Sequence, residues 1–348
     1  MPHPLRSFTR MTVFTVVICC SAGVMVTLAD AAEDKTLSGS FFPYDAFERL
    51  PSTRIEVGGR ALSVAFGPGD LWMSRATVLA WVNRCATAVA TYFGRLPAPT
   101  ARLLIVPTAG TGVRGGTTWG YRGAASRILL GREATERQLK QDWVLVHELT
   151  HQGFPIVPDE QHWLEEGLAT YVEPIARRQI GDLSEEKVWG DLVAGLPKGL
   201  PGPDDRGLNR TPTWGRTYWG GAMFYLLADI EIRRRTDNHQ GLQDALGALV
   251  AAGGNITHRW PVERVLATAD GGTGTHVLEE MYDRMKETPE TVDLPELWRR
   301  LGVVMHGKTV SFDDEAPLAS IRRAITATPA RGLLRARMPT APRASRSR

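Results

Sequence analysis

The chain has few cysteines for its length, three among 348 residues. Two of them, Cys19 and Cys20, lie in an apolar stretch near the N-terminus, so Cys85 stands alone in the rest of the chain. This excludes a scaffold held together by disulfides. Cys85 lies in a mostly apolar stretch of helical character, and we expect it to be a small buried hydrophobe and not a nucleophile.

A strong excess of one charge is also missing. The formal net charge is +3, and six arginines without any acidic residue fall in residues 331–348. The body, residues 32–330, is slightly acidic once these arginines and the N-terminal charges are set aside. We therefore expect no nucleic-acid partner. The last stretch combines arginine with proline and serine, which predicts a disordered basic tail over residues 331–348.

One long uncharged and mostly apolar run covers residues 11–29. Two arginines precede it, and Ala29 and Ala31 supply the small residues of a cleavage site. This order is typical of a secretory signal peptide, which we place at residues 1–31. The run also approaches the length that crosses a bilayer, so an uncleaved membrane anchor is the alternative. In both cases the rest of the chain is exported, to the periplasm or outside the cell, and after cleavage no stable membrane span is expected.

The first half of the body predicts a β-rich lobe over residues 36–134. Its patterns indicate a hairpin over 53–66, an amphipathic helix over 74–93 and a buried strand over 102–106. The glycine-rich stretch that begins at Gly110 has the spacing of a dinucleotide-binding fingerprint, but no helix pattern opens at its third glycine. We therefore expect no nucleotide cofactor.

The second half predicts a mostly helical lobe over residues 135–330. A helix over 135–152 begins with a capping box of Thr135 and Gln138. A second helix is expected over 161–178 and a third over 217–235, whereas the Gly-, Pro- and Asp-rich residues 183–212 predict mainly loop with one short helical turn.

The first of these helices carries His147-Glu148-Leu149-Thr150-His151. Two histidines four positions apart lie one turn apart on the same helix face, where both imidazoles can reach one zinc ion. Glu148 lies beside that face and can take a proton from an activated water. The alternative without a function is a surface helix that happens to carry two histidines. The position of the motif inside a helix with clear capping signals favours the metal site.

A catalytic zinc site needs three protein ligands and one open position. The helix after the histidines offers the adjacent acids Glu165 and Glu166 within Trp-Leu-Glu-Glu-Gly-Leu-Ala-Thr-Tyr, residues 163–171. A short loop can fold this helix back onto the first one. On spacing alone, both acids are candidates.

The two motifs together resemble the gluzincin clan of zinc metallopeptidases, closest to its glycyl- and alanyl-aminopeptidase-like catalytic domains. The resemblance implies that Glu166 is the third zinc ligand and that Glu165 is solvated or beside the ligand. Residues 217–221, Thr-Tyr-Trp-Gly-Gly, are similar to the glycyl-aminopeptidase branch, which implies that Tyr218 stabilises the oxyanion. It also implies an α+β fold of the thermolysin-like zincin type, with a small β-sheet lobe packed on the zinc helix and a mostly helical C-terminal lobe.

The chain departs from the large aminopeptidases in one respect that matters for the substrate. Those enzymes carry a glycine-rich strand with an acid that grips the substrate's free amino group, and residues 114–121 have no acid. The choice between exo- and endopeptidase therefore stays open.

The sequence thus predicts an exported Zn²⁺-dependent metallopeptidase that hydrolyses a peptide or protein substrate, with Glu148 as general base. One alternative is a catalytically idle zinc-binding module for a peptide or cell-envelope partner, and another is a zinc hydrolase for a different bond. The idle module would have no use for Glu148, which is not a ligand. The oligomeric state is not predicted.

Overall fold

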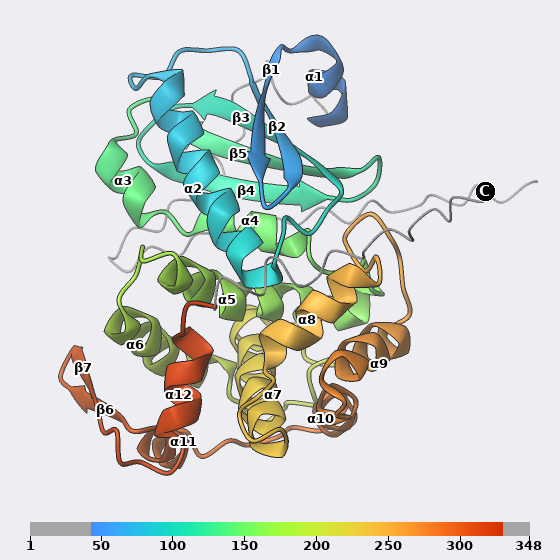
Figure 1. Cartoon of the computed structure of the whole chain (residues 1–348), viewed down its shortest axis with the longest axis vertical. Helices are drawn as coiled ribbons and strands as arrows, with labels where there is room; N and C mark the ends of the chain where they lie inside the picture. Colours follow the sequence, from blue (N-terminus) through green and yellow to red (C-terminus); the bar gives the residue numbers. More distant parts are fainter. Residues whose placement is uncertain (1–42, 330–348) are drawn as a thin grey trace, which may run out of the picture.

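The computed structural model of the chain describes residues 43–329. The expected signal peptide and basic tail lie outside these residues. Figure 1 shows the strands of the main sheet gathered in one half of the molecule and most helices in the other. No helix within the described part combines the length and apolar character needed to cross a membrane.

The main sheet has five strands in the order β1-β2-β3-β5-β4. Two parallel pairings in the middle, β2 with β3 and β3 with β5, are flanked by antiparallel β1 and β4. This order makes β4 an edge strand. The strands are β1 (Ser52–Val57), β2 (Arg60–Phe66), β3 (Thr100–Thr108), β4 (Val113–Trp119) and β5 (Ala124–Gly131).

Local signals fix the first elements where the sequence predicts them. The β1–β2 turn uses Gly58 and Gly59, both with positive φ, which glycine adopts without strain. Helix α2 (Arg75–Phe93) begins where the Ser74 hydroxyl accepts from a backbone N–H and ends at Gly94 in the left-handed region. Cys85 is buried on α2, as expected.

The helix predicted over residues 135–152 is two helices, α3 (Glu136–Gln141) and α4 (Val144–His151). The Thr135–Gln138 capping box is present. The break lies at Asp142, whose carboxylate oxygens accept from the N–H groups of Val144 and Leu145 at 3.1 Å each. An aspartate that bonds the following N–H groups begins a new helix, so the single-helix prediction was wrong at this point.

The helical half is built around α5 (His162–Gln179) and α7 (Gly221–Arg235). A π-helical turn, η3 (Gly215–Gly220), leads directly into α7, where the sequence predicts one regular helix. Residues 183–212, predicted as mainly loop with one short helical turn, contain the longer helix α6 (Glu185–Gly195), which Ser184 caps and which buries Val188, Trp189 and Leu192. That burial stabilises a helix in a stretch of unfavourable composition.

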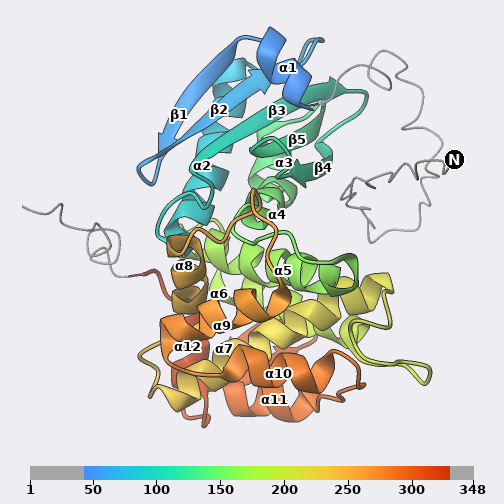
Figure 2. The same cartoon turned by 90° about the vertical axis from the view of Figure 1, so that its right-hand side faces the viewer.

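Of the remaining elements, α1 lies at the sheet, and the helices from α8 onward complete the helical half around α5 and α7 (Figure 2). A small hairpin, β6 with β7, stands apart from the main sheet. The bounds are α1 (Pro43–Arg49), η1 (Asp159–Gln161), η2 (Leu196–Gly199), α8 (Leu242–Ala251), α9 (Val262–Thr273), α10 (Val277–Met285), α11 (Leu294–Leu301), β6 (Val303–His306), β7 (Thr309–Phe312) and α12 (Ala319–Thr326).

Helix α4 lies between the two halves (Figure 1). It packs against the sheet at β4 and β5 and against the helices α2 and α5. All eight of its residues are buried. One apolar cluster runs from α2 and the inner strands through α4 into the helical half. The predicted α+β arrangement, with a small sheet lobe packed on the helix that carries the histidines, is confirmed.

Candidate metal centre

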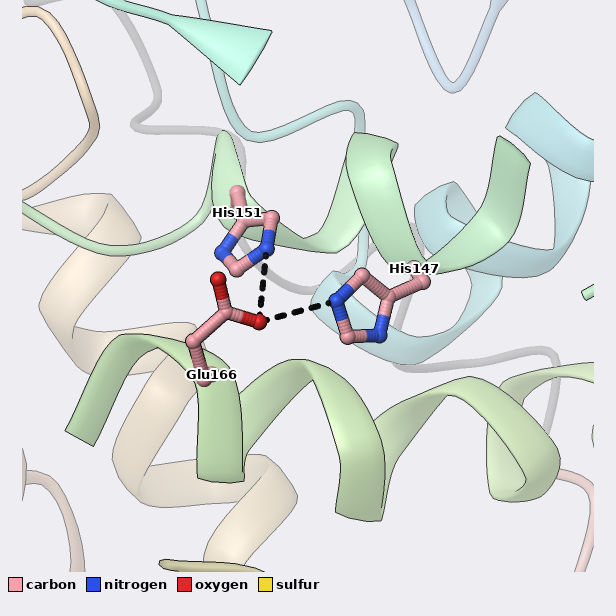
Figure 3. A group of neighbouring side chains, drawn as sticks. All are labelled: His147, His151 and Glu166. Atoms are coloured by element: carbon pink, nitrogen blue, oxygen red, sulfur yellow. Dashed lines mark hydrogen bonds and ion pairs between the residues drawn. The ribbon is translucent and has the colours of Figure 1, made fainter. Parts of the chain in front are cut away.

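Three side chains converge where α4 faces α5. His147 and His151 project from successive turns of α4 toward Glu166 on α5 (Figure 3). Their exposed fractions are 1%, 4% and 1%. The potential ligand atoms of the three residues lie within 4.8 Å of one another. The structure therefore brings together the three residues that the motifs single out as ligands.

The separations between these atoms suit a small tetrahedral cation. The Oε2 atom of Glu166 lies 3.2 Å from Nε2 of His147 and 3.7 Å from Nε2 of His151. Bonds of 2.0–2.1 Å in a tetrahedron place neighbouring ligand atoms roughly 3.3 Å apart. Two imidazoles and one carboxylate are also a donor set that zinc accepts, so these residues fit a Zn²⁺ ion.

The protonation of the three side chains also suits metal binding. Burial lowers the pKa of His151 to about 3, which keeps its imidazole neutral. Burial alone would raise the pKa of Glu166, but the charges of the histidines and the hydrogen bond with His147 outweigh it and hold the pKa at about 2. Burial pushes the pKa of His147 down, yet the bond to Glu166 and its charge raise it overall. A cation in the centre would therefore compete with the proton that His147 can carry.

Glu148 is completely buried beside the ligands. Its Oε2 accepts a hydrogen bond of 2.7 Å from the Thr118 hydroxyl on β4. Its Oε1 is buried without a hydrogen-bond partner among the described residues. Burial is the main reason that the pKa of Glu148 is raised to about 7. One oxygen is thus held in place and the other is available to accept a proton.

The edge strand β4 packs directly against the side chain of Glu148. A Cβ added to Gly116 would lie 2.4 Å from Cγ of Glu148, so only glycine fits there, whereas a Cβ on the neighbouring Gly115 would meet open space. The sequence pointed to residues 114–121 only through their lack of an acid. It did not predict the contacts of Thr118 and Gly116 with Glu148, for which the one local signal is the pair of adjacent glycines followed by two threonines.

Tyr218 reaches the centre from the π-helical turn η3. Its ring stacks on that of His147, with 6.3 Å between centroids and 16° between planes. Burial, followed by the charge of the nearby Glu166, raises the pKa of the Tyr218 hydroxyl far above the ordinary value. The turn leads into α7, whose Gly221 packs backbone to backbone on Gly167 of α5. A Cβ added to Gly167 would lie only 2.4 Å from Cα of Gly221, so the two helices can approach this closely only with glycine at position 167.

Glu165 points away from the three ligand atoms. It is 7% exposed, so it is not a solvated side chain. Its Oε1 accepts from the N–H of Val157 at 3.0 Å, and its Oε2 lies 3.4 Å from Nδ1 of His162. His162 in turn places Nε2 3.5 Å from Oε1 of Glu166. Glu165 therefore contacts the candidate ligand Glu166 through His162. Of the two positions that the resemblance implies for Glu165, solvated or beside the ligand, the structure shows the second.

One other group of described residues has the composition of a metal site, Asp270 with His276 and Glu279. The two carboxylate oxygens of Asp270 already accept from the N–H groups of Leu278 and Glu279 at the start of α10. His276 is exposed. Asp270 therefore caps the start of α10, and we do not interpret this group as a metal site.

No protein-family model matches the chain, and no curated protein matches its sequence. Among solved structures it is similar to an aminopeptidase N family protein from Idiomarina loihiensis, with 16% identity and a TM-score of 0.57 over 74% of this chain and 50% of that one. An M1 zinc metallopeptidase from Deinococcus radiodurans is also similar, with 17% identity and a TM-score of 0.45 over 69% of this chain and 53% of that one. The chain thus spans about half the length of these proteins. The resemblance to aminopeptidase-like zinc metallopeptidases, carried in the sequence by two short motifs, is confirmed for the fold of the described residues.

Proposed function

We propose that this protein is a zinc-dependent metallopeptidase in which His147, His151 and Glu166 bind the metal and Glu148 is the general base. The observation that carries the proposal is the convergence of the three ligand atoms within 4.8 Å, beside a buried carboxylate with one unpartnered oxygen. The shared fold supports it. The activity of the solved relatives is not transferred by the fold alone, and it is the site that points to hydrolysis.

A zinc ion in this position supplies Lewis acidity that polarises a carbonyl and activates water at neutral pH. Glu148 then accepts a proton at Oε1 and later delivers it to the leaving amine. A base is most effective when its pKa is close to the working pH, and burial has raised that of Glu148 to about 7. The Thr118 hydroxyl holds Oε2, so the carboxylate keeps its orientation through both transfers.

Tyr218 donates a hydrogen bond to the carbonyl oxygen as negative charge grows on it. Its raised pKa keeps the hydroxyl protonated, and therefore a donor, throughout the physiological range. The stacking of its ring on His147 holds the side chain at the centre before substrate arrives. A donor that is already in position costs little reorganisation during the reaction.

The first experiment measures metal content by plasma mass spectrometry in the purified wild type, Glu166→Ala and Glu148→Gln, followed by cleavage of a peptide library with free and acetylated N-termini. We expect about one zinc per wild-type chain, less in Glu166→Ala, and zinc without cleavage in Glu148→Gln. Cleavage of the acetylated peptides would identify an endopeptidase, in agreement with a β4 strand that carries no acid.

Two results would contradict the proposal in different ways. A wild type with zinc but no cleavage of any peptide would point to the idle zinc-binding module. A wild type that does not bind zinc would remove the metal centre itself.

The proposal includes export, which rests on the signal-peptide pattern of residues 1–31. The test is the N-terminal residue of the protein recovered from fractionated cells, determined by mass spectrometry. A new N-terminus near Ala32 in the soluble exported fraction supports cleavage. A full-length chain in the membrane fraction would instead favour the uncleaved anchor.

A further inference from the structure

A cavity of about 360 Å³ opens onto the candidate metal centre, with His147 and Tyr218 in its wall. From there it extends between α5, α6, η2 and η3. Its volume is at the small end of the range for ligand pockets, enough for one substrate side chain with its neighbouring backbone. None of the catalytic steps described above uses it.

Tryptophans dominate the walls of this cavity. Trp143, Trp214 and Trp219 all line it. Trp143 and Trp214 are 37% and 45% exposed, among the few large apolar side chains of the described residues that face solvent to this extent. Exposed aromatic faces that meet in one concave site indicate a binding surface and not a folding core.

The aromatic rings form a continuous series that reaches the centre. Trp143 meets the His147 ring edge to face at 5.4 Å, and Trp214 stacks on Tyr218 at 5.8 Å and 26°. Trp219 is held in place because its ring packs on Gly195, where an added Cβ would lie 1.9 Å from Cζ3 of the ring. The walls are therefore preorganised, with two rings open to a partner.

The charges in the cavity argue against a basic occupant. Glu173 already has Arg177 at 2.7 Å, and Asp191 has Lys187 at 2.6 Å. Lys198 lines the same cavity without an ion pair among the described residues, and its ammonium lies 5.9 and 5.5 Å from the ring centroids of Trp214 and Trp219. The cavity thus carries one unbalanced positive charge, which repels a lysine or arginine side chain.

We propose that this tryptophan pocket, defined by Trp143, Trp214 and Trp219, selects peptide substrates with an aromatic side chain next to the scissile bond. The proposal rests on the proposed peptidase function and names its substrate class. Aromatic rings gain edge-to-face and offset-stacked contacts with tryptophan beyond the burial of their area, which an aliphatic side chain does not. An acidic side chain could meet Lys198, but it would gain none of these contacts with the tryptophan rings.

The test compares kcat/KM of the full chain for matched peptides that differ at one position beside the cleaved bond, with Ala, Leu, Phe, Lys or Glu there. We expect the Phe peptide to be cleaved best, and Trp214→Ala to lower its kcat/KM about tenfold, far more than that of the Ala peptide. The control is Trp72→Ala, a still more exposed tryptophan, 78% exposed, that does not line the pocket. Preference for Lys or Glu, or an equal loss on both peptides, would overturn the proposal.

A second measurement does not depend on cleavage. The amide of 4-fluorophenylalanine is added to the wild type, Trp214→Ala and Trp72→Ala, and broadening of its fluorine resonance reports binding. Broadening that is lost only in Trp214→Ala supports the pocket even where no peptide is cleaved, in which case the proposed function alone fails. Equal broadening in all three proteins, or none in any, would overturn the pocket.

Discussion

The side chain of Glu148, the proposed general base, has little freedom to move. The Thr118 hydroxyl bonds one carboxylate oxygen, and Gly116 leaves just enough room for the side chain. Ser126 lies 3.0 Å from the Thr118 hydroxyl oxygen, and Gln152 donates to Ser126 at 3.2 Å. Glu148 is therefore the end of a short buried hydrogen-bond chain, and small changes on β4 are expected to alter the position of this proposed base.

Replacing Thr118 by Val removes the hydroxyl and keeps a similar volume. We expect kcat to fall about tenfold or more, since the general base loses its orientation, with little change in KM. Thr118→Ser restores the hydroxyl and should recover much of kcat. Zinc content and unfolding midpoint are measured beside the kinetics.

Thr117→Val is the matched control, because the neighbouring Thr117 hydroxyl donates to the carbonyl of Gly116 and not to Glu148. An unchanged kcat in Thr118→Val, or an equal loss in Thr117→Val, would show that the contact has no positioning role.

The two adjacent glycines of β4 allow a sharper comparison. Gly116→Ala would force Glu148 to move, and displacement of a catalytic group by about 1 Å can lower the rate about 100-fold. Gly115→Ala meets open space and should leave kcat within about twofold of the wild type. Steady-state kinetics on both variants, with circular dichroism to verify folding, checks this. Equal effects of the two substitutions would mean that the close packing at Gly116 is not what positions the base.

Among the elements, the break between α3 and α4 decides where the histidines point. Asp142 ends one helix and begins the next, and the new axis of α4 lies between the sheet and α5. A single straight helix over residues 135–152 would have a different direction through His147 and His151. The cap at Asp142 is thus part of what aims the ligands at Glu166.

Removing this cap should destabilise the fold. Asp142→Ala leaves the buried N–H groups of Val144 and Leu145 without their acceptor, which costs about 1–2 kcal/mol. Asp142→Asn keeps one acceptor and should cost less. Urea unfolding of the three proteins measures the free energies. Arg137→Ala, at an exposed position of α3, is the control and should stay within about 0.5 kcal/mol of the wild type.

For the whole molecule, the metal centre joins the two halves. His147 and His151 belong to the helix that packs on the sheet, and Glu166 belongs to the helical half. A ligand that binds only the folded chain adds about 2.7 kcal/mol of stability when its concentration is 100 times Kd. Zinc should therefore raise the unfolding temperature of the entire described region, and a chelator should reverse the effect.

This stabilisation should depend on pH in one direction. The pKa of His147 is raised, so below it a proton occupies the site that zinc needs, whereas His151, with a pKa of about 3, competes little. The zinc-dependent rise in unfolding temperature is fully present above the pKa of His147 and shrinks as the pH falls through it. Differential scanning fluorimetry at pH 7.5 and pH 5, with Glu166→Ala as the zinc-deficient control, measures this. An undiminished rise at pH 5 would contradict these ligands.

What the sequence by itself determined are features set by neighbours along the chain. The spacing of His147 and His151 needs only helical geometry, and the caps at Ser74, Gly94 and Thr135 depend on side chains a few residues away. The first sheet hairpin follows from two adjacent glycines. Glu166 and Tyr218 come from a resemblance of short motifs, and the structure places both beside the histidines.

What only the tertiary structure decided are contacts between distant segments. Thr118 meets Glu148 thirty residues later along the chain, and no local pattern announces that pair. Helix α6 forms in a stretch predicted as mainly loop because burial of Trp189 outweighs local propensity, and Gly167 and Gly221 let α7 approach α5 closely. The tryptophan pocket likewise joins residues from α5, α6 and η3. Such contacts depend on how the chain packs in three dimensions, which pattern and spacing along the sequence do not encode.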